Sequence, residues 1–311
     1  MATHDPVTVE DLRAVLAAVG SPRDIDALPP DLGSRERTNV FIVGDVVVKI
    51  DLTDVRRAAR ERAALDHLAS TDLPVPRCLG SGVLDDGREW VATGRLDGRA
   101  PPDAARPVHE ISPSLAAQLG AITARLHATP SPGYIGPVTH RFDSHVDKAA
   151  RQSQRMVSLG YGKHCVPREE VDDLMILLDA TRPCLATAPQ PARLVHGDVQ
   201  PRNVLVDGSG TITALIDFEV AGGGDQTEDF ALVGLDWQAP GFAAFCAGYA
   251  EAGGQLDGDA PARVAHHVGR WALAVFVYLG SFAPAYLELA RRAVERLRAG
   301  EVPDLGLAVR A

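Results

Sequence analysis

The chain has 311 residues and a formal net charge of −10, with 31 Lys and Arg against 41 Asp and Glu. Hydrophobic residues make up 46% and charged residues 23%, which is typical of a globular protein and excludes a disordered or fibrous chain. The acidic balance argues against nucleic acid as a partner, because phosphate-binding surfaces need clustered Lys and Arg. At this length we expect two domains or one large unit of two parts.

The cysteines and the first residues bear on the compartment. Four cysteines stand far apart without a Cys-x-x-Cys pair: Cys78, Cys165, Cys184 and Cys246. This spacing predicts neither a disulfide framework nor a zinc site, and it is typical of a chain in the reducing cytoplasm. The N-terminus has no basic start followed by an apolar stretch, so we expect no secretory signal.

One uncharged segment, residues 271–287, raises the question of a membrane span. It is shorter than the ~20 apolar residues that a span needs, and Gly280 and Pro284 interrupt it. We therefore expect a buried pair of helices there and no membrane partner.

The first third of the chain predicts a small sheet with helices. Residues 8–19 have apolar positions spaced by three and four, which indicates a helix. Residues 39–50 form two β-rich runs around Gly44 and Asp45, the pattern of a tight hairpin. A helix over residues 55–69 should follow, capped by Thr53 or Asp54.

The rest of the chain changes character after a linker. Two further strands are expected at residues 78–84 and 89–93, and a passage rich in Pro and Gly follows at 94–107. Beyond it the pattern is mostly helical, apart from a β-like island at residues 194–216. We predict an α+β protein with a small N-terminal part, 1–96, and a larger helical part, 97–311.

The densest chemical signal lies in the β-like island. Asp198 and Asn203 are separated by four residues, which is the spacing of a kinase catalytic loop. A turn at residues 207–210 then leads to a return strand that ends at Asp217 and brings it beside Asn203. An Asp in a loop is more often a turn former or a cap, so only the combination is specific. Three converging oxygen-bearing side chains suit Mg²⁺, and Asp198 is then free to accept a hydroxyl proton.

These motifs resemble those of the aminoglycoside phosphotransferases, a family of the protein-kinase-like superfamily. The matching residues run from His196-Gly-Asp to Asn203 and from Ile216-Asp-Phe-Glu to Asp225, with Asp229 beyond. The resemblance extends over most of the chain. It implies a bilobal kinase-like fold, with an antiparallel sheet and a helix in the small lobe and a mainly helical large lobe.

The resemblance also implies roles for single residues. Asp198 is the catalytic base, and Asn203 and Asp217 hold Mg²⁺ against the phosphates of ATP. Lys49 contacts the α- and β-phosphates, with Glu61 as its ion-pair partner. The residues support this pair independently, because Lys49 ends a hairpin strand and Glu61 is the only Glu on the next predicted helix. The alternatives are an edge-strand Lys that discourages aggregation and a solvated charge cluster.

Two further nucleotide contacts are expected in the first third. Gly33 and Ser34 precede the first hairpin strand, where a phosphate-covering loop belongs, although the segment is neither GxGxxG nor a Walker P-loop. By resemblance, residues 91–96, with Thr93 and Arg95, form the hinge whose backbone receives the adenine.

The neighbours of the catalytic loop have structural alternatives. Asp225 and Glu228 have the spacing of a helix capping box, which is the favoured interpretation. His196 is expected to orient the loop rather than to transfer protons. Protein kinases carry a Lys two residues after the catalytic Asp. Gln200 stands there in this chain, and whether Arg202 replaces the missing charge stays open.

The acceptor is expected to be a small molecule, because seven residues separate Asp217 from Asp225 and leave no room for a peptide-docking segment. From Asn203 to Ala262 the chain has ten acids and no Lys or Arg. This run could attract a cationic substrate, and surface caps and turns are the alternative. The candidate substrate-binding acids are Glu219, Asp225, Glu228 and Asp229.

Together these features predict an ATP-dependent O-phosphotransferase, with GTP open, that uses Mg²⁺ and confers resistance. The acceptor is a hydroxyl of a cationic antibiotic: an aminoglycoside, a hygromycin-like compound or a basic cyclic peptide. The alternatives are a macrolide kinase, a metabolic kinase acting on choline, homoserine or a fructosamine, and an inactive nucleotide-binding regulator. The antibiotic, the hydroxyl and the oligomeric state are left undetermined.

Overall fold

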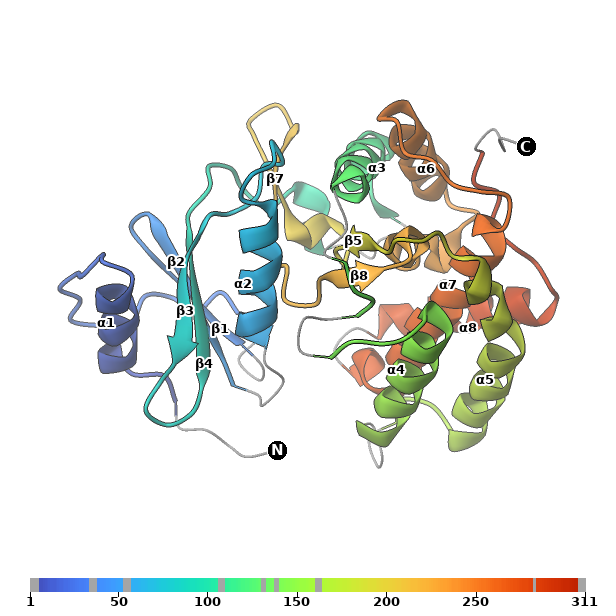
Figure 1. The fold of residues 1–311 in the computed structure, drawn as a ribbon, viewed down its shortest axis with the longest axis horizontal. Helices are drawn as coiled ribbons and strands as arrows, with labels where there is room; N and C mark the ends of the chain where they lie inside the picture. The colour runs from blue at the N-terminus through green and yellow to red at the C-terminus, as the bar shows by residue number, and fades with distance from the viewer. Residues whose placement is uncertain are drawn as a thin grey trace.

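The computed structural model describes residues 6–33, 38–52, 57–105, 110–129, 133–136, 140–159, 164–281 and 284–306. Two unequal lobes lie side by side, a small one built on a sheet and a larger, mainly helical one (Figure 1). The predicted α+β class is therefore confirmed.

The small lobe is a four-stranded antiparallel sheet between two helices. Its strand order is β1-β2-β4-β3. The elements are α1 (Val9–Ala18), β1 (Thr38–Val43), β2 (Val46–Asp51), α2 (Arg57–Leu68), β3 (Cys78–Val83) and β4 (Glu89–Gly94). Helix α1 covers one face of the sheet, and α2 covers the other and faces the large lobe (Figure 1). The predicted caps of α2, Thr53 and Asp54, lie outside the described residues.

The two-residue period of strand β2 determines where its lysine points. Val48 and Ile50 are fully buried in the apolar core under α1. Lys49 stands between them in sequence and therefore points to the opposite face, toward α2. The predicted hairpin is confirmed, with its turn at Gly44, whose φ of +63° is the left-handed conformation that glycine adopts without strain.

The chain passes from the small to the large lobe over a few residues. The backbone N–H of Arg95 donates to the carbonyl of Asp45 in the first hairpin, at 2.8 Å. Four residues later, Arg99 pairs with Val206 of the large lobe. The crossing therefore lies between residues 95 and 99.

The large lobe consists of helices around two short strand pairs. The helices are α3 (Pro113–Ala128), α4 (His145–Leu159), α5 (Arg168–Thr181), α6 (Pro240–Glu251), α7 (Ala260–Val277) and α8 (Ala285–Arg298). The strand pairs are β5 (Arg193–Val195) with β8 (Gly222–Gly224), and β6 (Val204–Val206) with β7 (Ile212–Leu215). Short 3-10 turns include η4 (Pro201–Asn203) and η5 (Gln226–Phe230).

Helix α7 forms the centre of the large lobe. From Leu273 to Val277 each of its side chains is buried, and α8 packs beside it after a short break. The helix pair predicted for residues 271–287 is thus confirmed. In the described part of the chain, no helix combines the length and apolar character that crossing a membrane requires.

Candidate active site

Lys49 joins the two lobes at the centre of the site. Its Nζ donates to both oxygens of Glu61, at 2.8 and 2.9 Å, and to Oδ1 of Asp217, at 2.8 Å. Burial opposes the charge on Lys49, but the carboxylates of Asp217 and Glu61 outweigh it and raise the pKa of Lys49. The structure thus brings together these three predicted residues and keeps the ammonium charged.

Asp217 is held in an unusual backbone conformation. Its φ is +73°, a conformation that residues other than glycine adopt only under local constraint. The constraint comes from both sides, because the preceding residue, Ile216, donates its N–H to the carbonyl of Asn203, and Lys49 holds the carboxylate. Burial opposes ionisation, yet Lys49 outweighs it and lowers the pKa of Asp217. A charged carboxylate is therefore fixed at the mouth of the β6–β7 hairpin.

Asp198 and Asn203 are in direct contact across the predicted catalytic loop. The Nδ2 of Asn203 donates to Oδ2 of Asp198 at 2.9 Å and to its backbone carbonyl at 2.8 Å. Gln200 donates its amide to the other carboxylate oxygen, Oδ1. Arg202 approaches Oδ2 at 3.6 Å, but its side chain is 61% exposed. Gln200 therefore supplies a neutral donor where the kinase loop has a Lys, and Arg202 supplies a screened charge.

A buried carboxylate, Asp229, holds the start of the catalytic loop. It accepts hydrogen bonds from the backbone N–H of His196, at 2.8 Å, and of Gly197, at 2.6 Å. Behind it, His127 of α3 lies 3.0 Å from Oδ2 of Asp229 and, through Nδ1, 3.0 Å from the hydroxyl of Tyr249 on α6. The sequence predicted Asp229 as a substrate contact and did not identify His127. The structure places Asp229 inside the lobe, at 1% exposure.

His196 is fully buried and has the orienting position that its sequence context predicts. Its Nε2 lies 3.0 Å from the carbonyl of Ile216, and its ring packs against Phe218. The histidine thereby connects the loop that carries Asp198 to the strand end that carries Asp217.

Glu219 is bound from the small lobe. Nη1 of Arg57, in the first turn of α2, donates to Oε1 of Glu219 at 2.8 Å. Burial and the nearby carboxylate of Asp217 raise the pKa of Glu219 to about 7. The sequence does not predict this contact of Arg57, because helical periodicity indicates which face of α2 is buried but not which charged residue that face meets.

Asp225 and Glu228 form the predicted capping box and begin turn η5. Both are also neutralised from elsewhere in the lobe. Arg263 of α7 donates its Nε to Asp225 at 2.9 Å, and Lys148 of α4 contacts both oxygens of Glu228, at 2.7 and 2.8 Å. Lys148 is one of only three lysines in the chain, and this scarcity is the sequence signal that could have identified it.

Most of the acidic run is paired in this way. Six of its ten acids form ion pairs with Lys or Arg from outside the run: Asp217, Glu219, Asp225, Glu228, Asp236 and Asp257. The bases reduce the negative potential that the sequence alone suggested.

The loop before β1 is organised by Asp31. Its Oδ1 accepts the N–H of Gly33 and of Val40, both at 2.9 Å. A Cβ at Gly33 would lie 2.0 Å from the carbonyl oxygen of Thr38, so only glycine fits this close approach of the backbone. Gly33 thus has a structural requirement of its own, and Ser34 lies outside the described residues.

The predicted hinge lies at the end of β4. Thr93 is buried within the sheet and is paired with Val47 and Cys78. Arg95 is exposed, and its guanidinium approaches the carbonyl of Gly44 at 3.4 Å, in the hairpin turn. Both residues lie near the C-terminal end of β4, an interior strand, where the chain leaves the small lobe.

The donor set at Asn203 and Asp217 fits one kind of cation. In the ranges that the structure describes, no group of three or more His, Cys, Asp and Glu is placed to hold a metal ion. The amide nitrogen of Asn203 is directed at Asp198, so its oxygen is the atom available to a cation. One amide oxygen and one carboxylate match Mg²⁺, which is commonly held by one or two protein ligands together with substrate phosphates.

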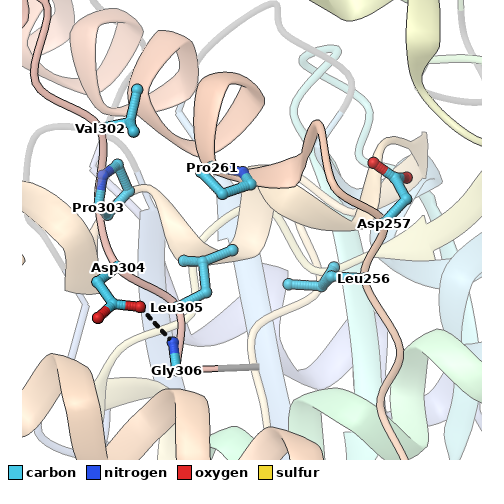
Figure 2. Close-up of a pocket in the computed structure, with 8 residues that line it drawn as sticks. All are labelled: Leu256, Asp257, Pro261, Val302, Pro303, Asp304, Leu305 and Gly306. Atoms are coloured by element: carbon cyan, nitrogen blue, oxygen red, sulfur yellow. Dashed lines mark hydrogen bonds between the residues drawn. The ribbon is translucent and has the colours of Figure 1, made fainter. Parts of the chain in front are cut away.

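Two hollows on the described surface involve none of the predicted site residues. One, of about 250 Å³, lies where residues 302–306 pass the start of α7; Figure 2 shows Leu256, Pro261 and Leu305 around it. The other, of about 310 Å³, is lined by charged residues of α8 and by Glu301. Contacts rather than cavity shape therefore define the candidate active site.

The two-lobe fold and the arrangement of Lys49, Asp198, Asn203 and Asp217 define a kinase-like phosphotransferase. A model of the phosphotransferase enzyme family APH matches residues 28–267, more than half of the chain. The chain belongs to this family and is a small-molecule kinase. The resemblance inferred from the motifs is confirmed.

Solved structures share the fold at low sequence identity. A thermostable mutant of aminoglycoside phosphotransferase APH(4)-Ia, in a ternary complex with ADP and hygromycin B, is 19% identical with a TM-score of 0.67, over 94% of this chain and 99% of that one. Macrolide 2'-phosphotransferase MphH from Brachybacterium faecium is 21% identical with a TM-score of 0.58, over 94% and 99%. The GDP and kanamycin complex of APH(2")-IIia is 15% identical with a TM-score of 0.59, over 93% and 98%.

Proposed function

We propose that the protein transfers a phosphoryl group from ATP to a hydroxyl of a small-molecule antibiotic. The observation that carries this proposal is the contact between Lys49 and Asp217 across the lobes, beside the paired Asp198 and Asn203. A fixed ammonium, a fixed carboxylate and a hydrogen-bonded base are thereby brought together, and these are the parts that phosphoryl transfer requires.

Each residue would have a defined task. Lys49, held by Glu61, would bind phosphate oxygens and balance their charge. Asn203 and Asp217 would hold Mg²⁺, which when bound supplies further positive charge at the phosphates. Asp198 would orient the acceptor hydroxyl and accept its proton at Oδ1 or Oδ2. Gly33 and Ser34 would cover the phosphates, and the hinge with Thr93 and Arg95 would receive the base.

The division of labour between the lobes is part of the proposal. Residues 1–96 would bind the nucleotide, and residues 97–311 would carry the base and the acceptor site. The crossing between Arg95 and Arg99 supports this division. A location in the cytoplasm is consistent with the four cysteines, which are free thiols.

The charge of the acceptor decides between two substrate classes. A cationic antibiotic remains the first candidate, with Glu219 and Glu228 as the acids nearest to solvent among the four predicted. The ion pairs within the acidic run favour a second candidate with less positive charge, such as a macrolide. Hygromycin B, kanamycin and macrolides are acceptors or ligands of the structural relatives and provide the first compounds to test.

A panel assay tests the proposal. The protein is incubated with Mg·ATP or Mg·GTP and one acceptor at a time: aminoglycosides, basic cyclic peptides, macrolides, choline, homoserine and a fructosamine. Mass spectrometry then detects the phosphorylated product. We expect a product with an antibiotic, and expression of the chain should raise resistance to the same compound. A product with choline, homoserine or a fructosamine alone would contradict the proposal.

A further inference from the structure

A second ion pair joins the lobes beside the one made by Lys49. Helix α2 presents Arg57 and Glu61 on one face, because residues four apart lie one turn above each other. Glu61 binds Lys49, and Arg57 binds Glu219, two residues after Asp217. One helix face therefore contacts both the phosphate-binding Lys and the loop that carries the proposed metal ligand.

The two ion pairs differ in what the reaction demands of them. Under the proposed function, Lys49 must exchange part of its contact with Asp217 for phosphate oxygens, and Asp217 must turn toward Mg²⁺. Neither Arg57 nor Glu219 has to exchange its partner when the nucleotide and Mg²⁺ bind, although Glu219 remains a candidate contact for a cationic acceptor. Their side chains are 17% and 21% exposed, so the pair is screened much less than a surface ion pair. The Arg57–Glu219 contact can therefore persist when the Lys49–Asp217 contact opens.

We propose that Arg57 is a positioning residue whose ion pair with Glu219 keeps α2 aligned with the Asp217 loop while the nucleotide binds. Without it, the apolar end of α2, which shares a core cluster with the large lobe, would stay in place, but the first turns of α2 could shift and Glu61 would carry Lys49 with it. This inference rests on the proposed function for its kinetic consequence. The alignment of α2 itself can be measured in the free protein.

The helix offers a competing cation and a matched control. Arg60 interacts electrostatically with both Arg57 and Glu219. Its Nε is buried without a hydrogen-bond partner in the described structure. Removing Arg57 could let Arg60 approach Glu219, so the variant Arg57→Ala/Arg60→Ala is included. Arg62, also on α2, forms an exposed pair with Asp66 and is the control.

The experiment compares the single variants Arg57→Ala and Glu219→Ala with the double variant Arg57→Ala/Glu219→Ala and with the charge-swapped Arg57→Glu/Glu219→Arg. Arg57→Ala/Arg60→Ala is measured alongside them, and Arg62→Ala is the control. The KM for Mg·ATP is measured with the acceptor found in the panel, and hydrogen exchange of the α2 amides is measured without nucleotide. We expect each single variant to raise the KM about three- to tenfold, with kcat changed less, and to speed exchange in α2. In Arg57→Ala/Glu219→Ala the KM and the exchange rate should be no higher than in the single variants, and the charge-swapped variant should recover part of the loss.

Several outcomes would overturn the proposal. Additive effects in the double variant would mean that the two residues do not act as a pair. A KM and an α2 exchange rate unchanged in both Arg57→Ala and Arg57→Ala/Arg60→Ala would remove the positioning role, as would an equal effect of Arg62→Ala. If the wild-type protein phosphorylates no acceptor, the proposed function fails instead, and α2 exchange in the nucleotide-free variants still decides the role of Arg57.

Discussion

Lys49 is the residue on which the electrostatics of the site depend. Glu61 is almost completely buried, with a side chain 3% exposed, and its two oxygens both bind the ammonium. Removing one partner of a buried pair leaves an uncompensated charge, which costs more than the pair itself contributes. The residue is thus required for stability as well as for the proposed phosphate contact.

We predict that Lys49→Ala lowers the free energy of unfolding by about 3 kcal/mol, because Glu61 stays behind in the interior. Urea denaturation measures the change. The double variant Lys49→Met/Glu61→Leu should recover part of the stability, because Glu61 no longer leaves a buried charge, whereas Asp217, with a side chain 32% exposed, still loses its partner. If Lys49→Ala had the same midpoint of urea denaturation as the wild type, Glu61 would have to be solvated in the variant, and the prediction would be wrong.

The buried ion pair of Glu228 makes the free energy of unfolding depend on pH. Burial opposes its ionisation, but Lys148 outweighs burial and lowers the pKa of Glu228 from 4.5 to about 2. The unfolded chain binds this proton more tightly than the folded one. The stabilisation is therefore present above pH 4.5 and is lost as the pH falls toward 2.

Replacing Glu228 by Gln should remove this dependence. We expect Glu228→Gln to be about 3 kcal/mol less stable than the wild type at pH 6 and to approach it near pH 2. Unfolding free energies at a series of pH values test this difference, and Lys148→Met, which removes the partner, should lose stability with the same sign. A constant gap between Glu228→Gln and wild type at all pH values would contradict the assigned cause.

At the scale of elements, the packing of α3 against α6 supports the catalytic loop. A Cβ at Gly120 would lie 2.0 Å from the carbonyl oxygen of Phe245, and one at Gly248 would lie 2.0 Å from that of Ala117. Two glycines on facing helices thus allow the backbones to approach closely. The same helices carry His127 and Tyr249, whose contact leads to Asp229. The close approach of α3 and α6 is therefore needed for His127 and Asp229 to hold the loop in place.

A substitution on α6 tests this dependence. In a helix, Gly→Ala normally stabilises by up to about 1 kcal/mol. We predict the opposite for Gly248→Ala, a loss of about 1–3 kcal/mol, because the added methyl group forces the helices apart. Gly241→Ala on the same helix is the control, since its Cβ would meet only ordinary contacts at 3.4 and 3.6 Å. Equal stability of the two variants in thermal unfolding would contradict the packing argument.

The type and order of most elements could be predicted from periodicity and turn residues. The hairpin at Gly44, helix α2 and the strand pair β6–β7 depend on local signals, and the structure has them where the pattern predicts. The short strand β8 consists of Gly222, Gly223 and Gly224 and carries no strand signal. It pairs with β5 only because the folded lobe brings the two segments together.

At the scale of the whole molecule, the contacts of the site that the sequence predicts are local in the chain, and the contacts that it does not predict join distant segments. Asp198 and Asn203 precede the short β6–β7 hairpin and Asp217 follows it, so local sequence was sufficient to bring them together. Arg57 and Glu219 are 162 residues apart, and Lys148 and Glu228 are 80 residues apart. Such partners are chosen by the packing of whole lobes, which sequence spacing does not report.

The net charge also has a different meaning in the folded protein. Ten acids without a base in sequence suggested an open negative surface, but folding brings bases from α2, α4, α7 and α8 and from Lys49 of β2 to six of them. Charge patterns along a chain therefore predict less about a binding surface than the ion pairs of the fold do.

The most direct test of the central claim, that Asp198 activates the acceptor hydroxyl, is the phosphoryl transfer rate of Asp198→Asn. The substitution preserves size and leaves one oxygen to accept from Asn203. We predict that transfer slows by at least about a hundredfold while the affinity for the nucleotide changes less than about twofold, the pattern of a lost general base. A transfer rate within a few-fold of wild type would contradict the account.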